Sequence, residues 1–221
     1  MPVPAIEELE EVTRLGGGGP RKPVGPSQDG GRGDGESRRG PEVGTRAAMT
    51  GIWLAIAAIV MFFAALTSAY VVRKGTSDDW APFPLPKLLW LNTAVLLASS
   101  GTLELARRSR GRGLAPGEFR RWWGLTTALG VAFLVGQVLA WRQLVAAGVY
   151  LATNPSGSFF YVLTAAHALH LLGGVLALLY AAARGRTDAS APAVKVAAVY
   201  WHFMGGLWLY VLVLLHLGGW S

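Results

Sequence analysis

The sequence predicts an all-α membrane protein, a bundle of five transmembrane helices with a cytoplasmic N-terminus and an external C-terminus. Hydrophobic residues make up 52% of the 221 positions and charged residues only 15%, a composition that is uncommon in soluble domains. The charged residues crowd the first 46 positions and a few short clusters, which leaves long uncharged stretches between them. Lys and Arg are also divided unequally between alternate loops, and this bias sets the orientation of a membrane protein.

Residues 1–48 are expected to form a separate, disordered cytoplasmic tail. The stretch 16–46 is rich in Gly, Pro and Arg and cannot bury enough apolar surface to offset the entropy of ordering. Its glycines do not predict a phosphate-binding loop, because no strand precedes them and no Gly-Lys-Ser/Thr follows. The apolar core and the cleavage site of a signal peptide are also absent from this N-terminus. The sequence assigns no role to this tail.

Residues 49–221 are expected to form the membrane domain. Each predicted span is long enough to cross about 30 Å of hydrocarbon at about 1.5 Å per residue. The uncharged stretch 143–183 is too long for one helix, and "TNPSG" at 153–157 interrupts it with turn-forming residues, so a loop is predicted at 143–156. The five predicted spans are 48–72, 88–106, 122–141, 158–183 and 196–217.

The orientation follows from the basic residues around these spans. On one side lie Arg32, Arg38, Arg39, Arg46, Arg107, Arg108, Arg110, Arg112, Arg120, Arg121, Arg184, Arg186 and Lys195. On the other side lie only Arg73, Lys74, Lys87 and Arg142. The richer side is predicted to be cytoplasmic. Tryptophans near the span ends are expected to form an aromatic belt at the two interfaces: Trp80, Trp90, Trp122, Trp123, Trp141 and Trp220.

Histidines inside the last two spans are the first candidates for function. His167 and His170 are three residues apart, so they share roughly one helical face near the bilayer midplane, and His202 lies in the fifth span nearer the cytoplasm. Imidazoles from two neighbouring helices would be able to ligate a haem iron or another metal. Alternatively, each histidine hydrogen-bonds across helices, or to a carbonyl one turn away, and stabilises the packing. The absence of cysteine excludes disulfides, thiolate zinc sites and iron–sulfur clusters.

Glu104 is the only acidic residue within a predicted span. It lies one helical turn from Arg107 and Arg108, so an ion pair at the cytoplasmic interface is expected, with a role in proton uptake as the alternative. The net charge of +7 is explained by the loops beside the spans and does not predict nucleic-acid binding. No internal repeat supports a small transporter, and the spans offer no nucleophile, paired carboxylates or phosphate cradle.

Three stretches together resemble one family of membrane proteins. "FFYVLTAAHALHLLGGV" (159–175) and "YWHFMGGLWLYVLVLL" (200–215) are similar to the last two helices of subunit III of the haem–copper terminal oxidases. "GIWLAIAAIVMFFAALTSAYVVRKG" (51–75) resembles the third helix of that family, and the sequence 78–107 continues in the same register. The resemblance runs from about residue 49 to the C-terminus.

The resemblance implies a non-catalytic subunit of an oxygen-reducing complex in a bacterial inner membrane. Such a subunit packs on subunit I, holds phospholipid between its helices and supports sustained turnover and proton uptake. Haem and copper are then expected in subunits I and II, with no redox centre in this chain, and cytochrome c or quinol is reached only through the complex. The family motif comprises His167, His170, Tyr200, Trp201 and His202, with structural roles.

Two departures from the family pattern qualify the resemblance. The long form has seven helices, and this chain matches the short five-helix bacterial form. Many members carry a buried Glu where this chain has Ile59, so the proton-related role of that Glu is not carried over. The alternatives that the sequence leaves open are an accessory subunit of a nitric oxide reductase and a haem b membrane anchor.

Overall fold

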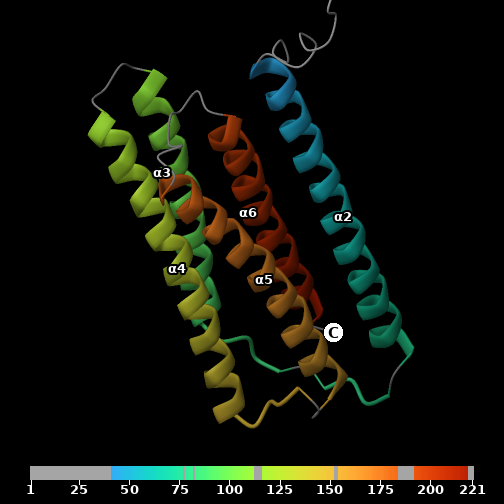
Figure 1. Cartoon of the computed structure of the whole chain (residues 1–221). Helices are drawn as coiled ribbons and strands as arrows, with labels where there is room; N and C mark the ends of the chain where they lie inside the picture. Colours follow the sequence, from blue (N-terminus) through green and yellow to red (C-terminus); the bar gives the residue numbers. More distant parts are fainter. Residues whose placement is uncertain are drawn as a thin grey trace, which may run out of the picture. The chain divides into compact units, whose positions relative to one another are not determined.

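The described helices confirm the predicted fold class. The computed structural model describes residues 41–76, 78–81, 83–111, 116–151, 154–183 and 192–218, all within one unit that covers residues 39–221. These residues form five α-helices and no strand (Figure 1). The helices are α2 (Pro41–Thr76), α3 (Leu88–Gly111), α4 (Pro116–Ala146), α5 (Pro155–Ala183) and α6 (Pro192–Gly218). All five are long and apolar enough to cross a membrane.

Four of these helices begin at a proline: Pro41, Pro116, Pro155 and Pro192. Proline suits the first helical position because its fixed φ is helical and its missing N–H has no partner there. The helices therefore extend beyond the predicted spans. Most of the span ends were placed at charged residues, whereas a helix continues into the headgroup region, where water solvates charged side chains. Residues 41–48, predicted to be tail, begin α2; residues 1–40 lie outside the described part.

The connection between α4 and α5 is shorter than the predicted loop at 143–156, because α4 continues to Ala146. Gly148 has a φ of 81°, a left-handed conformation that favours glycine. The N–H of Val149 then donates to the carbonyl of Leu144 at 3.0 Å, which completes a Schellman motif. At the start of α5, Asn154 Oδ1 accepts from the N–H of Gly157 at 2.8 Å and caps the helix.

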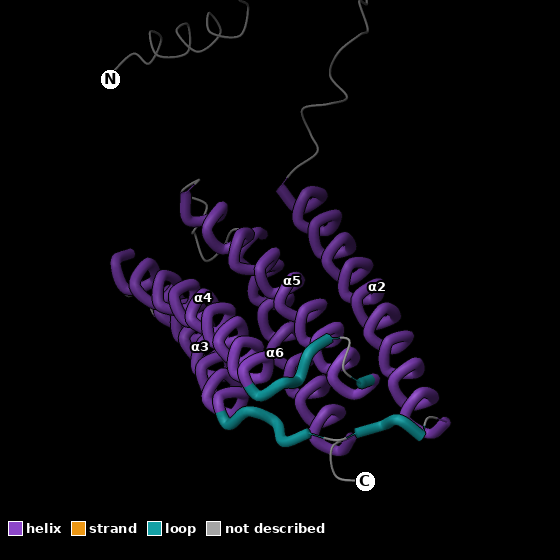
Figure 2. Tube along the Cα trace, turned by 90° about the horizontal axis from the view of Figure 1, so that it is seen from below, coloured by secondary structure: helices purple, strands orange, loops and turns teal. Residues whose placement is uncertain are grey.

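The last four helices surround a shared core, and α2 packs at one side of them. α3 contacts α4 and α6, and α5 contacts α4 and α6, so that α3 to α6 form a closed ring. α2 contacts α6 and α5 only, as both views of the described helices indicate (Figures 1 and 2). Of the most apolar part of α2, 17% is buried, against 39–50% for the other helices. Most of α2 therefore faces outward.

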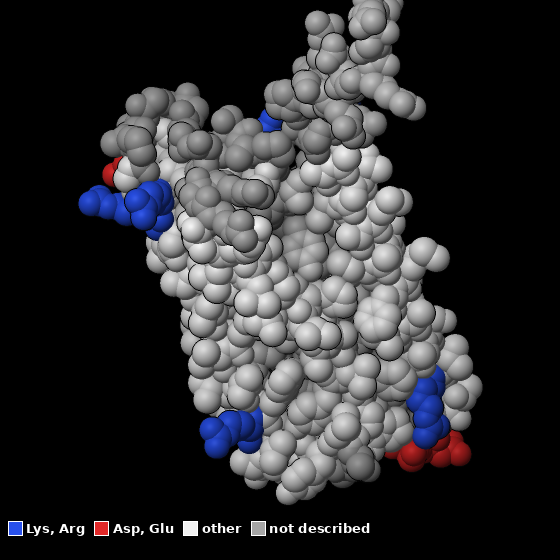
Figure 3. Space-filling view, viewed as in Figure 1, with Lys and Arg blue, Asp and Glu red and all other residues white. Residues whose placement is uncertain are grey.

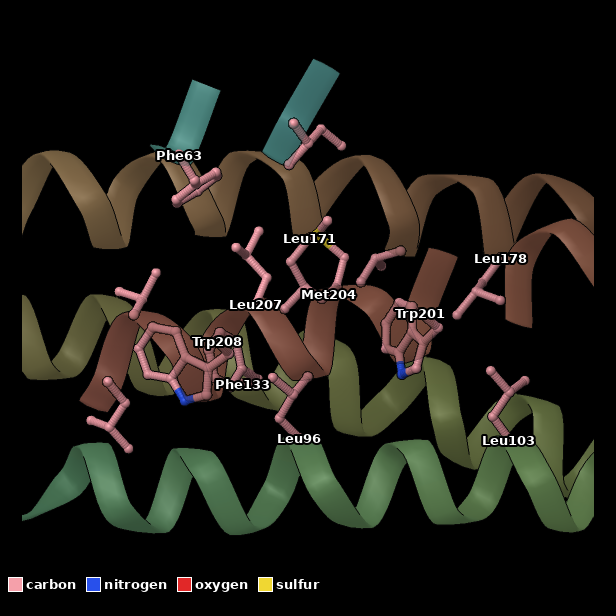
Figure 4. Packing of buried hydrophobic residues seen from close by; sticks show 14 of the residues in the cluster. Phe63, Leu96, Leu103, Phe133, Leu171, Leu178, Trp201, Met204, Leu207 and Trp208 are labelled. Carbon is pink, nitrogen blue, oxygen red and sulfur yellow. The ribbon is translucent and has the colours of Figure 1, made fainter. Parts of the chain in front are cut away.

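The core lies along one side of α6, where Trp201, Met204 and Trp208 are fully buried (Figure 4). Trp208 packs against Phe133 of α4, and Trp201 reaches Ser99 of α3. The spacing of three and four residues on α6 keeps them on one face. The core therefore joins three helices that are far apart in the sequence.

Charged side chains lie at the two ends of the bundle. On the face shown in Figure 3, Lys and Arg occur at both ends and the band between them carries no charge. We call the end where α2, α4 and α6 begin the arginine-rich end. Its described basic residues are Arg46, Arg107, Arg108, Arg120, Arg121 and Lys195. An uncharged band between two charged ends is expected for a protein that spans a membrane.

Candidate functional site

His167 lies at the centre of the helix ring and is fully buried. Its imidazole packs between Phe133 of α4 and Trp208 of α6, with ring centroids 5.8 and 5.0 Å apart. Neither ring nitrogen has a hydrogen-bond partner among the described residues. The cross-helix hydrogen bond expected for His167 is therefore not made by this part of the chain, and its contacts are aromatic.

His170 points to a different neighbour. Its Nδ1–H donates to the carbonyl of Ala166, one turn earlier, at 2.7 Å, and its ring packs against Phe62 and Phe63 of α2. Its own carbonyl accepts a hydrogen bond from Tyr200 of α6 at 2.8 Å. The residue thus links α5 to both α2 and α6. The three-residue spacing rotates it about 60° from His167, which is enough to change the neighbouring helix.

Trp201 fixes the contact between α6 and α3. Its Nε1–H donates to Ser99 Oγ at 3.0 Å, and Ser99 donates to the carbonyl of Leu96 at 2.7 Å. The indole also lies against the backbone of α4 at Gly130, where an added Cβ would be 2.6 Å from Trp201 Cη2. Any larger residue at this position therefore has to displace the ring.

The same arrangement of indole, hydroxyl and carbonyl occurs twice more and was not predicted from the sequence. Trp208 Nε1–H donates to Thr93 at 2.9 Å, and Thr93 donates to the carbonyl of Leu89. Trp141 Nε1–H donates to Thr164 at 3.0 Å, and Thr164 donates to the carbonyl of Phe160. Each hydroxyl satisfies its own helix and accepts a bond from another. Ser and Thr inside apolar spans were the feature of the sequence from which these interhelical bonds could have been predicted.

The prediction that tryptophans at the span ends form an aromatic belt was wrong for Trp123. Trp123 is buried and its Nε1–H donates to the carbonyl of Leu178 at 3.2 Å, so it joins α4 to α5. Trp141 is half-buried and forms the interhelical bond described above. Trp90 is exposed, and its ring contacts His216. Trp220 lies outside the described residues.

His202 faces outward. The imidazole is exposed on α6 and forms none of the cross-helix hydrogen bonds predicted for it within the described part of the chain. Glu104 of α3 interacts with the imidazole electrostatically. The ion pair expected for Glu104 is present, because Arg108 Nε donates to it at 2.9 Å and Arg107 at 3.2 Å.

The arrangement of the histidines does not suit haem or metal ligation. His167 points into the ring, His170 packs on α2, and His202 is exposed on the outside of α6. Within the described residues, no three His, Asp or Glu side chains lie close enough together to hold a metal ion. The rings of His167 and His170 instead contact side chains of α2, α4 and α6.

Three of the grooves that the described residues form lie between pairs of helices. One, of about 720 Å³, lies between α4 and α5, begins at Arg120 and continues over Gly124 and Thr127. A second, of about 360 Å³, lies between α2 and α6 and is almost wholly apolar. A third, of about 740 Å³, lies between α2 and α5 at the opposite end, beside Arg73 and Asp79, which form an ion pair at 3.0 Å.

Replacing His167 with leucine is expected to change the free energy of unfolding by less than about 1 kcal/mol, or to raise it. The imidazole has no hydrogen bond to the described residues to lose, and an apolar side chain of similar size removes the cost of burying a polar group. Titration with SDS in mixed micelles measures this free energy.

The control is Thr164→Val, one turn earlier on α5. It removes the hydroxyl that accepts the Trp141 bond and is expected to cost about 0.6–1.7 kcal/mol. A loss above about 2 kcal/mol for His167→Leu would contradict this expectation, because it would mean that the imidazole has a strong partner.

Comparison with known proteins places the chain among oxidase subunits. The sequence model of the family described as "Cytochrome c oxidase subunit III" matches residues 42–220. The chain is 35% identical over 166 residues to a probable cytochrome c oxidase subunit 3 of Nocardia farcinica, covering 72% of this chain and 80% of the relative. A probable cytochrome c oxidase subunit 3 of Mycobacterium tuberculosis is 34% identical over 166 residues, with the same coverage. A cytochrome c oxidase subunit 3 of Synechocystis is 31% identical over 182 residues, covering 76% and 75%.

Proposed function

This chain belongs to the cytochrome c oxidase subunit III family, and we propose that it packs on the catalytic subunit I of a haem–copper terminal oxidase, holds phospholipid and sustains turnover and proton uptake. The observation that carries this proposal is the extent of the match. It covers residues 42–220, and thus all the described helices except Pro41, the first residue of α2. The resemblance seen in the histidine helices and the comparisons therefore agree on a subunit III of such an oxidase.

The described polar groups support a structural role for the motif residues. Tyr200 and Trp201 each donate a bond to another helix, and His167 and His170 make aromatic contacts with three helices between them. Bonds between membrane helices are worth about 0.6–1.7 kcal/mol each, enough together to select one packing arrangement. We assign these residues to helix packing, and the haem and copper to the partner subunits I and II.

The arginine-rich end is proposed to be cytoplasmic, in a bacterial inner membrane. The support is the excess of Lys and Arg in the loops at that end, which marks the cytoplasmic side of a multi-pass protein. The C-terminus of α6 is then external. The similar proteins come from bacteria, in agreement with this membrane.

Phospholipid is proposed to occupy the surface grooves. The groove between α2 and α6 is lined by Val60, Phe63 and Leu207 among others, and it suits an acyl chain because it offers almost no polar groups. The groove between α4 and α5 opens beside Arg120, whose guanidinium suits a phosphate headgroup.

A side chain of this chain that takes part in proton uptake has to lie outside α2. Ile59, at the position where many relatives carry Glu, is 8% exposed and packs in the apolar core. Glu104 is the acidic residue that remains within a span, and its carboxylate is held by Arg107 and Arg108. We propose that Glu104 contributes an acidic side chain, ionised by its two arginines, to the subunit interface and that any effect of this chain on proton uptake is indirect.

The partners are proposed to be subunits I and II, with cytochrome c as the electron donor of the complex. The names of the similar proteins support cytochrome c rather than quinol, and they favour an oxidase over a nitric oxide reductase. This chain meets the donor only through the complex.

Purification of the tagged chain from native membranes tests this function. Mild detergent and mass spectrometry are expected to recover subunits I and II in equal amounts with the chain, together with phospholipid, and to give the absorbance of the oxidase haems. Recovery of nitric oxide reductase subunits, or of the chain alone with a haem of its own, would contradict the proposal.

A further inference from the structure

We propose that the outward face of α6 beside α3, defined by Glu104, His202, Gly206, Leu209 and Val213 and called here the α3–α6 face, docks on a transmembrane helix of the catalytic subunit. The inference rests on the proposed function, because it names the surface by which this chain packs on subunit I. The four α6 residues are exposed, and their spacing of three and four residues places them in one stripe along the helix.

The position of His202 within a membrane span indicates that a protein covers its side chain. It lies seven residues beyond Lys195, the last basic residue of α6, which is about 10 Å along the helix axis. Lipid tails there offer no hydrogen-bond partner, and the charged groups near His202, Glu104 and Arg107, belong to α3 of the same chain. Polar side chains within spans therefore face protein or a water-filled cavity. An imidazole exposed on the surface of the isolated chain indicates that another protein covers it.

The outward faces of α4 and α5 differ from this one. The exposed residues of α4 between positions 124 and 139, and those of α5 between 162 and 179, are all apolar or glycine. Such faces are suited to lipid tails. Among the outward faces of α4, α5 and α6, only that of α6 carries an exposed imidazole in the described residues.

The surroundings of His202 leave its imidazole available. Side chains on a helix lean toward its N-terminus, so His202 on α6 leans toward the arginine-rich end and Glu104 on the antiparallel α3 leans toward His202. The two interact electrostatically. Arg107 and Arg108 hold the carboxylate from the other side. The imidazole, which hydrogen-bonds to none of the described residues, is left to bond a partner.

The remainder of the face is shaped for a helix. Gly206 is exposed at the rim of the groove between α2 and α6, and an added Cβ there would meet nothing within 4 Å, so another helix is able to approach its backbone closely. Leu209 and Val213 are exposed at 38% and 55% and continue the stripe with apolar surface. The occupant is thus an apolar helix that presents a hydroxyl, amide or carboxyl side chain level with His202.

Site-specific photocrosslinking in the intact complex tests the face. A benzophenone amino acid is placed at Leu209, and a matched one at Leu169, which is exposed on α5 in the middle of its span. Irradiation of the purified oxidase is expected to join position 209 to the catalytic subunit and position 169 to lipid. A crosslink to subunit I from 169 but not from 209, or from neither position, would overturn the proposed face while the chain still co-purifies. Failure to co-purify with any oxidase subunit would instead refute the proposed function.

A second measurement addresses His202 itself. Replacing His202 with leucine is expected to weaken retention of the chain on the complex by roughly three- to fifteen-fold, the equivalent of one interhelical bond. His202→Gln keeps a hydrogen-bonding group and is expected to restore most of the retention. Unchanged retention in His202→Leu, or equal loss in both variants, would contradict a bond from His202 to the partner.

Discussion

Replacing Trp208 with alanine is expected to lower the free energy of unfolding by about 3–5 kcal/mol, more than any other single substitution in this chain for which we give a value. The indole is 1% exposed, packs against Phe133 with ring centroids 4.9 Å apart, contacts His167, and donates to Thr93. Its removal leaves a cavity at the point where α3, α4, α5 and α6 meet. SDS titration and the amount of subunit retained on the purified oxidase measure the loss.

Two variants separate the packing of Trp208 from its hydrogen bond. Trp208→Phe keeps a six-membered ring but removes the N–H donor and part of the indole volume, so a loss of at least about 1 kcal/mol, smaller than that of the alanine variant, is expected. Trp53→Ala deletes an indole on α2 that is 58% exposed, and close to no change is expected in detergent. If Trp208→Ala cost no more than Trp53→Ala, the core described for α6 would be incorrect.

Replacing Gly130 with alanine is expected to cost about 1–3 kcal/mol through overpacking. The new methyl group would be 2.6 and 2.9 Å from two carbons of the Trp201 ring and 3.1 Å from Val175 Cγ2. The indole is unable to move away without breaking its bond to Ser99. The expected result is a lower unfolding midpoint and weaker contact between α4 and α6.

Gly173 provides the matched control, because a Cβ there would meet nothing within 4 Å and Gly173→Ala is expected to be neutral. Combining Gly130→Ala with Trp201→Phe makes room for the methyl group. The double variant is therefore expected to lose less than the sum of the two single changes. Strict additivity would show that the methyl group and the indole do not meet.

The number and the order of the helices were predictable from the sequence because charge is excluded from the bilayer core. A stretch such as 47–72 carries no charged residue, and its length alone predicts a span. The helix ends were less predictable, since Pro116 and Pro192 begin their helices beyond the apolar stretch. A hydropathy pattern marks the apolar part of a helix and does not predict how far the helix continues into water.

The direction in which each side chain faces was not predictable in the same way. Lipid and protein interior are equally apolar, so no hydrophobic pattern distinguishes the buried face of a membrane helix from the exposed one. His167 and His202 both interrupt apolar sequence, yet one is fully buried and the other exposed. Trp123 lies near a span end, as belt residues do, yet it bonds to α5. Only the tertiary contacts separate these cases.

A comparison of the purified oxidase with and without this chain decides whether the chain is a non-redox subunit that sustains turnover. Haem and copper are quantified per catalytic subunit, and oxygen consumption is followed from the first turnovers until activity ceases. We predict equal haem and copper and equal initial rates in the two preparations, with earlier loss of activity when the chain is absent. Loss of haem, copper or initial rate in proportion to the chain removed would contradict that role.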